Sequence, residues 1–298
     1  MDLSIITVTW NVNDYARENF KAIYANTQGI KYEIFAVDNN SKDGTADMIK
    51  AEFPGVHLIA NSYNAGFAKA NNQAIKHAKG RYILLLNPDM RVLQGTLEGM
   101  VRWMDSRPEA GVAGCHLIKE DGATVPHVRR WPKFCDQMAI ILKLPHFFPG
   151  ILDNYLRNDF DYKKEAIVDS VRGSFFMIRK EAFKNEPTTE DLKAGKTLPY
   201  LDERYFIWFE EVDYCRQAKN AGWKVMYTPS VKCIDYVGKS FALMKRGKTQ
   251  EYFRDSMIKY FKKWHPAWQA ALIRLAWPIG IMIAAIGEKL NLKTNAKT

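Results

Sequence analysis

The sequence predicts an α/β fold built on a doubly wound, mostly parallel sheet. Four short runs are rich in aliphatic and β-branched residues, a pattern typical of strands that are covered on both faces. Helix-like stretches at 14–26 and 67–78 alternate with these runs, and that alternation predicts parallel strands joined by crossover helices. The four strand-like runs are Ser4–Thr9, Glu33–Val37, Val56–Ala60 and Tyr82–Leu86.

The length and composition leave room for one large domain or two small ones. The chain has 298 residues, of which 47% are hydrophobic and 26% are charged, so wholly disordered and low-complexity classes are excluded. Its four cysteines are widely separated, with no C-x-x-C pair, which favours neither a zinc site nor a disulfide framework. No secretion signal precedes the first strand-like run, so we expect a cytoplasmic protein.

The positive charge is concentrated at the C-terminal end. The net charge is +10, and residues 239–298 hold 12 Lys and Arg against 3 Asp and Glu. The rest of the chain is therefore close to neutral, unlike a nucleic-acid-binding protein with a basic surface throughout. This asymmetry predicts a globular body with a basic appendage, whose natural partner is an anionic membrane surface.

The C-terminal appendage contains two predicted helices. Residues 242–264 form a basic amphipathic stretch with several aromatic residues, which is typical of an interfacial helix. The apolar run 267–286 is long enough to cross a bilayer, but Arg274 and Pro278 argue against a span. A second apolar stretch, 138–152, could join it at the membrane. The alternative is that both helices pack on the globular body or form a homodimer seam.

Polar residues directly follow the predicted strands, where ligands bind in doubly wound sheets. Asp38 begins a turn rich in Asn, Ser, Asp and Gly, which suits either nucleotide contacts or a plain Asx-turn with a helix cap. Asp89 ends the segment Asn87-Pro88-Asp89, and a carboxylate there suits a divalent cation or a simple turn. Residues 10–14 contain no glycine, which disfavours a dinucleotide-binding dehydrogenase.

Three acids in four residues follow a dense aromatic run further along the chain. Glu210, Glu211 and Asp213 open a predicted helix over 206–221. They form either a solvated helix N-terminus or a site whose carboxylates have raised pKa values for base catalysis. A strand pair is predicted over 168–178, and a short strand over 225–227.

Several segments together resemble the inverting family 2 glycosyltransferases of the GT-A fold, in their rhamnosyltransferase-like branch. The resemblance covers roughly residues 4–240 and depends on the order and spacing of its segments. It implies a Rossmann-like nucleotide-binding sheet with a C-terminal helical extension. The segments are VDNNSKDGT, NAGFAKANNQAI, LLLNPDM, VRGSFFMIRKEAF and YFIWFEEVDYCRQAKNAGW.

The resemblance also implies roles for individual residues. Glu211 is the expected general base, with Glu210 as the second choice, and Mg²⁺ or Mn²⁺ is expected at Asp89. Asp235 stands where the family often has a histidine that binds the metal. Whether Asp235 is a metal ligand is therefore left open at this point. The implied nucleotide-binding residues are Thr9, Asn11, Asp38, Asn40, Asn64, Gly66, Asn71 and Asn87. Those implied near the donor sugar and acceptor are Arg172, Gly173, Ser174, Trp208, Asp213 and Arg216.

These expectations combine into one functional prediction. Residues 1–240 would form the transferase domain, with a nucleotide-binding half over about 1–110 and an acceptor half over 111–240. The enzyme would transfer L-rhamnose from dTDP-rhamnose to a lipid-linked or cell-surface glycan, as a peripheral protein on the inner face of the cell membrane. The alternatives are a UDP-hexose or UDP-N-acetylhexosamine transferase of the same fold and a non-catalytic nucleotide-sugar-binding protein.

Overall fold

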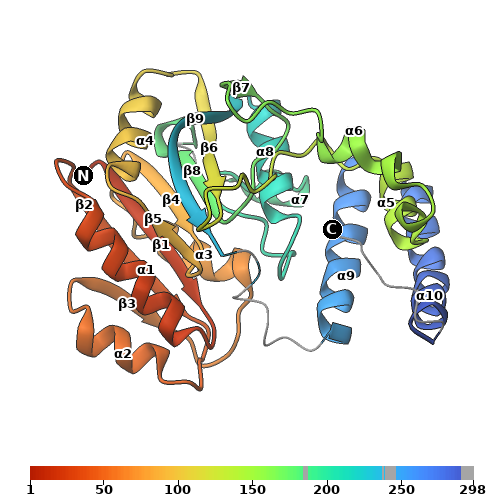
Figure 1. Cartoon of the computed structure of the whole chain (residues 1–298), viewed down its shortest axis with the longest axis horizontal. Helices are drawn as coiled ribbons and strands as arrows, with labels where there is room; N and C mark the ends of the chain where they lie inside the picture. The colour runs from red at the N-terminus through yellow and green to blue at the C-terminus, as the bar shows by residue number, and fades with distance from the viewer. Residues whose placement is uncertain (184–186, 237, 239–245, 290–298) are drawn as a thin grey trace.

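The computed structural model describes residues 1–183, 187–236, 238 and 246–289. Within them, a nine-stranded sheet runs in the order β3-β2-β1-β4-β8-β6-β9-β5, with β7 beside β9 (Figure 1). Strand order reverses beside β1, which lies between β2 and β4. The strands are β1 (Leu3–Thr9), β2 (Tyr32–Asp38), β3 (Val56–Ala60), β4 (Tyr82–Leu86), β5 (Met90–Val92), β6 (Ala110–Ile118), β7 (Ala166–Ile167), β8 (Phe175–Arg179) and β9 (Lys224–Asp235).

Helices cover both faces of the sheet. Successive residues of β1 belong to different cores, with Ile5 in one and Ile6 in the other. The first core includes side chains from α1 (Asn13–Asn26), α2 (Thr45–Glu52) and α4 (Thr96–Asp105). The second includes side chains from α3 (Phe67–Ile75) and α8 (Glu210–Asn220). The predicted doubly wound α/β architecture is therefore confirmed.

One half of the sheet is parallel and the other half is mixed. β1 pairs in parallel with β2 and β4, and β2 with β3, as the sequence predicts. β8 runs antiparallel to both β4 and β6, and β5 runs antiparallel to β9, so this half of the sheet is mixed. The strand pair predicted over 168–178 is one strand, β8, preceded by a loop. Strand β9 spans 12 residues, far more than the predicted 225–227.

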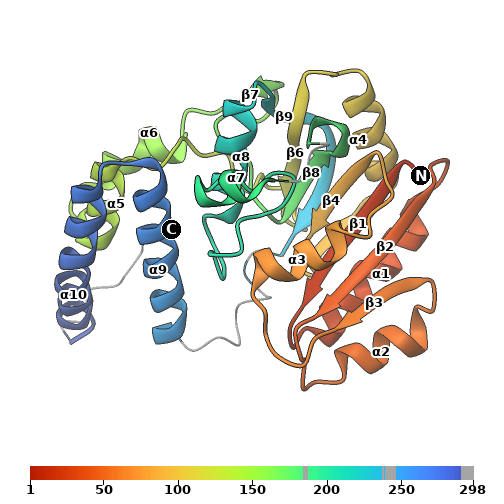
Figure 2. The same cartoon turned by 180° about the vertical axis from the view of Figure 1, so that it is seen from behind.

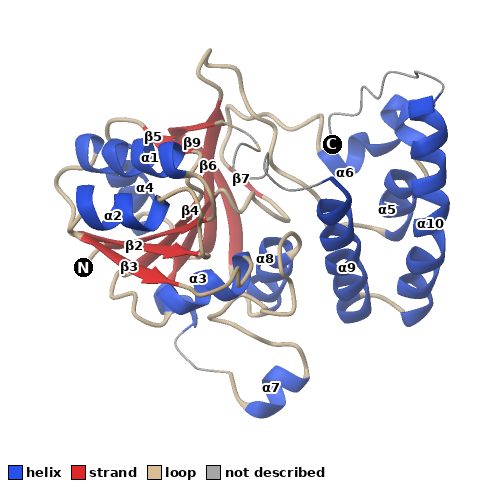
Figure 3. Ribbon diagram, turned by 90° about the horizontal axis from the view of Figure 1, so that it is seen from below, coloured by secondary structure: helices blue, strands red, loops and turns tan. Residues whose placement is uncertain are grey.

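A helical layer lies beside the sheet (Figures 2 and 3). Its longest members are α9 (Arg246–Trp264) and α10 (Ala267–Lys289). The first four residues predicted for α9, 242–245, lie outside the described residues. The remaining elements are α5 (Phe134–Ile141), α6 (Asp153–Leu156), α7 (Thr189–Lys193) and the 3₁₀ turns η1 (Leu144–His146), η2 (Pro149–Leu152) and η3 (Lys180–Phe183).

The two C-terminal helices differ in what they bury. Tyr260 and Phe261 of α9 are fully buried against the rest of the protein, so these aromatic side chains do not face outward as an interfacial helix would require. Helix α10 buries Ile273 but exposes Leu275 and other large apolar side chains. In the described part of the chain, we find no helix with the length and apolar character needed to cross a membrane.

Candidate active site

The loops that follow β1 and β2 are joined by the buried carboxylate of Asp38. The Thr9 hydroxyl donates to Asp38 Oδ1 at 2.9 Å, and the Ser41 backbone N–H donates to Oδ2 at 2.9 Å. The Asn11 backbone N–H donates to the Ser41 hydroxyl, and Asn11 Oδ1 accepts from the Lys42 N–H. Asp38 thus forms the turn that the sequence offered as an alternative to nucleotide contact, and it fixes the geometry of both loops.

A small pocket of about 60 Å³ lies at the carboxyl ends of β1 and β4. This is the switch point of the sheet, where ligands bind in doubly wound folds. Three residues predicted to bind the nucleotide, Asn64, Gly66 and Asn87, line it together with Asn39. The other lining residues are Val8, Trp10, Phe67, Pro88, Phe206 and Ile207.

Gly66 allows the loop before α3 to approach residue 206 closely. It has φ of +81°, and a Cβ added there would lie 2.5 Å from the carbonyl oxygen of Phe206. That same oxygen accepts a hydrogen bond from the Phe67 N–H at 2.7 Å. The side chain of Asn64 accepts from the Gly66 N–H at 2.9 Å. Segments 140 residues apart in sequence are therefore joined at one edge of the pocket.

The remaining predicted asparagines have mainly structural partners. Asn40, with φ of +61°, donates to the Ser62 carbonyl at 2.8 Å. Asn71 lies within α3, where it donates to the Phe67 carbonyl and does not line the pocket. Asn39, which sequence reasoning did not select, bonds to Gly66, Ala65 and Asn61. The sequence signal that could have identified Asn39 is its position between the two selected residues Asp38 and Asn40.

Asp89, which directly precedes β5, lies beside Asp235, the last residue of β9. Met90 is opposite Asp235 in the antiparallel β5–β9 pair, and the Tyr236 N–H donates to the Asp89 carbonyl at 3.2 Å. Both side chains are buried. Two carboxylates fit Mg²⁺ or Mn²⁺ when substrate phosphates supply further oxygens. Among the described residues, no cluster of three or more His, Cys, Asp or Glu could hold a metal without such help.

The segment Arg172-Gly173-Ser174 lies between this pair of carboxylates and the first turn of α8, called here the acidic turn, which holds Glu210 and Glu211. Arg172 Nη1 lies 3.3 Å from Asp235 Oδ2, and the Ser174 hydroxyl donates to the same oxygen at 3.2 Å. A Cβ added to Gly173 would lie 3.5 Å from Cβ of Glu211. The structure therefore brings the predicted metal ligand Asp235 and the predicted base Glu211 next to one short segment.

The acidic turn begins at Glu210 and not at residue 206. Trp208 and Phe209 have φ of +64° and +70°, so the chain enters α8 through a left-handed turn that a right-handed helix cannot contain. Burial, followed by the charge of Glu211, raises the pKa of Glu210 well above 4.5. Burial also raises the pKa of Glu211, an effect that Arg172 opposes.

One carboxylate oxygen of each of these glutamates stays without a protein partner. Oε2 of Glu210 and Oε2 of Glu211 are both buried, and neither accepts a hydrogen bond from any described residue. A carboxylate with a raised pKa and a free lone pair can remove a proton from a bound hydroxyl. The turn therefore has the chemistry of a general base.

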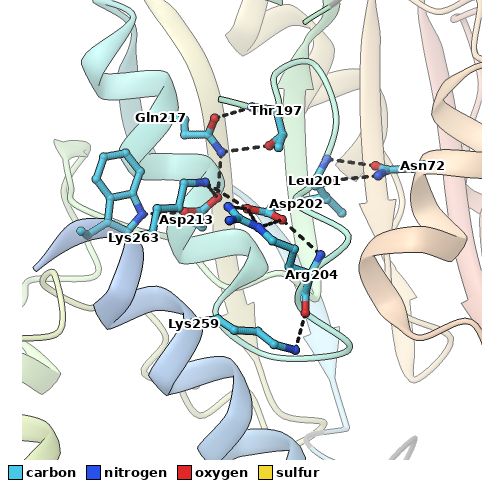
Figure 4. Close-up of polar contacts among 10 residues, drawn as sticks. Asn72, Thr197, Leu201, Asp202, Arg204, Asp213, Gln217, Lys259 and Lys263 are labelled. Carbon is cyan, nitrogen blue, oxygen red and sulfur yellow. Dashed lines mark hydrogen bonds and ion pairs between the residues drawn. The ribbon is translucent and has the colours of Figure 1, made fainter. Parts of the chain in front are cut away.

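Asp213 faces Lys263 of α9 (Figure 4), and Arg216 also contacts α9. Asp213 accepts hydrogen bonds from Lys263 Nζ at 2.7 Å, Trp264 Nε1 at 2.6 Å and Gln217 Nε2 at 2.7 Å. Arg216 donates to the Tyr260 hydroxyl and stacks over the Trp264 ring. These two residues, predicted near the donor sugar and acceptor, hold α8 and α9 together.

Comparison with known proteins finds similarity to glycosyltransferases. The family model described as glycosyl transferase family 2 matches residues 4–185. The N-acetylglucosaminyl-diphospho-decaprenol L-rhamnosyltransferase of Mycobacterium tuberculosis is 23% identical over 91% of this chain and 88% of its own length. Rhamnosyltransferase WbbL of Escherichia coli is 25% identical over 78% of this chain and 82% of its own.

A solved structure shows the same fold. Mannosyltransferase PcManGT from Pyrobaculum calidifontis, in complex with GDP-Man and Mn²⁺, superposes with a TM-score of 0.56 at 18% identity. The superposition covers 96% of this chain and 75% of the mannosyltransferase. The family match extends over more than half of the sequence, and the chain therefore belongs to glycosyl transferase family 2 and is a glycosyltransferase.

Proposed function

We propose that this glycosyltransferase moves one L-rhamnose unit from dTDP-rhamnose to a hydroxyl of a lipid-linked or cell-surface glycan, with inversion at the anomeric carbon. The choice of rhamnose is supported by the names of the two relatives, both of which are rhamnosyltransferases. A UDP-hexose or UDP-N-acetylhexosamine donor is the alternative. As a test acceptor we choose N-acetylglucosaminyl-diphospho-decaprenol, because the mycobacterial relative is named for it.

The observation that carries the proposal is the carboxylate of Glu211, whose Oε2 is buried without a protein partner, beside Gly173. In the proposed reaction Glu211 accepts the proton of the acceptor hydroxyl while that oxygen attacks the anomeric carbon. The bond from that carbon to the donor phosphate breaks, and the nucleoside diphosphate leaves from the opposite face with the bonding electron pair. General-base catalysis of this kind contributes roughly 10²–10⁴-fold.

The donor is proposed to bind at the switch point of the sheet. Asn64, Gly66 and Asn87 would contact the nucleotide in the pocket, while Asp38 would hold the loops that form it. Asp89 and Asp235 would hold Mg²⁺ or Mn²⁺, and Arg172 and Ser174 would orient Asp235. When bound, the cation supplies positive charge to the leaving diphosphate.

Replacement of the base tests the reaction. Glu211→Gln keeps the size of the side chain but removes its ability to accept a proton, so transfer of rhamnose to the test acceptor should fall by roughly 10²–10⁴-fold. Binding of dTDP, measured by titration calorimetry, should be unchanged. Glu190→Gln, at an exposed acid of α7, is the matched control. Full transfer by Glu211→Gln contradicts the proposed base, and a wild-type protein that binds nucleotide without transfer supports the non-catalytic alternative.

We further propose that α10 is the part of segment 241–298 that contacts the inner face of the cell membrane. Large apolar side chains recur along its exposed face at spacings of four and three residues, and between residues 246 and 283 there are seven basic residues against two acidic ones. Apolar area with basic charge suits an anionic lipid surface. The exposed residues at these spacings are Trp268, Leu272, Leu275, Ile279 and Met282, and Ile281 is exposed beside them.

Vesicle binding tests this surface. Leu275→Asp places a charge on the exposed face of α10, so co-sedimentation with phosphatidylglycerol–phosphatidylcholine vesicles should fall several-fold. Leu192→Asp, at an exposed apolar residue of α7, should bind vesicles as the wild type does. If instead the wild type does not co-sediment with vesicles and Leu275→Asp converts a dimer to a monomer, the exposed face of α10 is a homodimer seam.

A further inference from the structure

Segment 202–209 forms part of the candidate active site and is held from two sides. Phe206 and Ile207, called here the pocket wall, line the pocket at the carboxyl ends of β1 and β4. On one side, the Phe206 carbonyl accepts from the Phe67 N–H at the start of α3. A Cβ added to Gly66 would lie 2.8 Å from Cδ2 of the Phe206 ring, so the loop before α3 lies directly against the wall.

Helix α9 contacts the pocket wall from the other side. The Tyr252 ring stacks on the Phe206 ring, with centroids 4.2 Å apart and an angle of 22° between the planes. The buried Ser256 hydroxyl donates to the Ile207 carbonyl at 2.8 Å. Each of the two wall residues therefore has its own partner on α9.

Two lysines of α9 continue these contacts along the segment (Figure 4). Lys259 Nζ donates to the Arg204 carbonyl at 2.6 Å, and Lys263 Nζ lies 3.1 Å from Asp202 Oδ2. Lys263 also bonds to Asp213, and both carboxylates are buried. Removal of this cation would leave two buried charges without it and destabilise the fold, so Lys263 is a poor residue for a functional test.

The four contacts of α9 belong to one face of the helix. The α9 residues recur at spacings of four, three and four, which places them in one row along the helix. Their partners are four different residues of segment 202–209, so the helix face matches the segment over its length. The pairs are Tyr252–Phe206, Ser256–Ile207, Lys259–Arg204 and Lys263–Asp202.

We propose that this face of α9 positions the donor nucleotide by holding the pocket wall in place. None of its four residues lines the pocket, so they act through Phe206 and Ile207 and are positioning residues. A wall that is fixed before the nucleotide arrives spares the cost of ordering it on binding, and this raises affinity. The inference rests on the proposed function, because the pocket is proposed there to hold the nucleotide.

Replacement of Ser256 in the full chain tests this role. Ser256→Ala removes the donor to the Ile207 carbonyl, so the wall is held less firmly. The Kd for dTDP, measured by titration calorimetry, should rise about fivefold, which is the effect of one hydrogen bond. The KM for dTDP-rhamnose should rise by the same factor with kcat unchanged, because the loss affects ground state and transition state equally. Tm should fall by a few degrees.

Ser4→Ala is the matched control for a purely structural effect. Ser4 is fully buried at the amino end of β1, where its hydroxyl donates to Glu33 Oε1 at 2.6 Å and accepts from the Gly80 N–H at 2.8 Å. This variant should lower Tm at least as much as Ser256→Ala and bind dTDP as the wild type does. Wild-type affinity in Ser256→Ala, or an equal loss in both variants, overturns the inference, because the Ser256 hydroxyl would then serve stability alone.

Two exposed lysines of α9 give a second comparison. Lys259→Met removes the donor to the Arg204 carbonyl and should weaken dTDP binding about threefold. Lys262→Met makes the same substitution three residues further along, at an exposed lysine outside the row of four, and should bind as the wild type does. Equal dTDP affinities in the two variants contradict the positioning role of this face.

The wild type separates a failure of this inference from a failure of the proposed function. If it binds dTDP but transfers no rhamnose, the proposed reaction is contradicted, and the affinities of the variants still decide for or against α9. If it binds UDP in place of dTDP, the proposed donor is wrong, and the same comparisons with UDP decide. If it binds neither nucleotide, the proposed donor pocket is contradicted and the inference is overturned with it.

Discussion

The loops at the carboxyl ends of β1 and β2 and the acidic turn of α8 satisfy their buried polar groups in opposite ways. In the loops, Asp38 and Asn39 use their side chains to bind neighbouring backbone and side-chain groups. In the turn, Glu210 and Glu211 each keep a buried oxygen without a protein partner. The nucleotide side, where these loops lie, thus has loops held by bonds within the chain, whereas the acceptor side, at the acidic turn, keeps buried oxygens without a protein partner.

Of the changes that test this contrast, the largest effect is expected from crowding the preformed side, which is the nucleotide side. Gly66→Ala forces a Cβ to within 2.5 Å of the Phe206 carbonyl at a residue with φ of +81°, so the loop must move away from the pocket. We expect the affinity for dTDP, measured by titration calorimetry, to fall at least about tenfold. A tenfold loss corresponds to contacts worth about 1.4 kcal/mol of binding free energy.

A second glycine separates crowding from backbone strain. Gly122 has φ of +82° but no atom within 4 Å of an added Cβ. Gly122→Ala therefore introduces backbone strain without any steric clash. Its affinity for dTDP should equal that of the wild type. Equal losses in the two variants would mean that the close approach of Gly66 to Phe206 does not form the nucleotide pocket, and the contrast between the two regions would be lost.

The sequence predicts the preformed side better than the acidic turn because the determinants are local. Buried strands are readable from runs such as Tyr82–Leu86, and the polar residues that follow them must lie at the edge of the sheet. The prediction that the α8 helix begins at residue 206 was wrong, because the left-handed conformations of Trp208 and Phe209 leave no pattern in a sequence.

Long-range partners account for the other differences. Asp213 lies two residues after Glu211 and belongs to the same acidic run, but its partners Lys263 and Trp264 come 50 and 51 residues later. No local pattern distinguishes an acid that anchors a helix from one that is available for catalysis. The same holds for α9 and α10, which both have apolar residues at helical spacing, although Tyr260 and Phe261 of α9 are buried whereas Leu275 of α10 is exposed.

A smaller effect, on stability, tests the turn without any substrate. The folded-state pKa of Glu210 is raised above its ordinary value of 4.5, so the folded protein holds this proton more tightly than the unfolded chain. Below pH 4.5 both states are protonated and the stabilising contribution is complete. As pH rises through the folded-state pKa the contribution is lost, at about 1.4 kcal/mol for each unit of the shift.

Glu210→Gln removes this titration. Relative to the wild type, its free energy of unfolding, measured by urea titration at several pH values, should be unaffected by pH below 4.5 and should increase steadily above it until the folded-state pKa is passed. Glu190→Gln, at an exposed acid, should show no such trend. A flat difference for Glu210→Gln would mean that a partner already stabilises the charged carboxylate in the free protein. The acidic turn would then be as fully satisfied as the loops after β1 and β2, and the acceptor side would no longer differ from the nucleotide side.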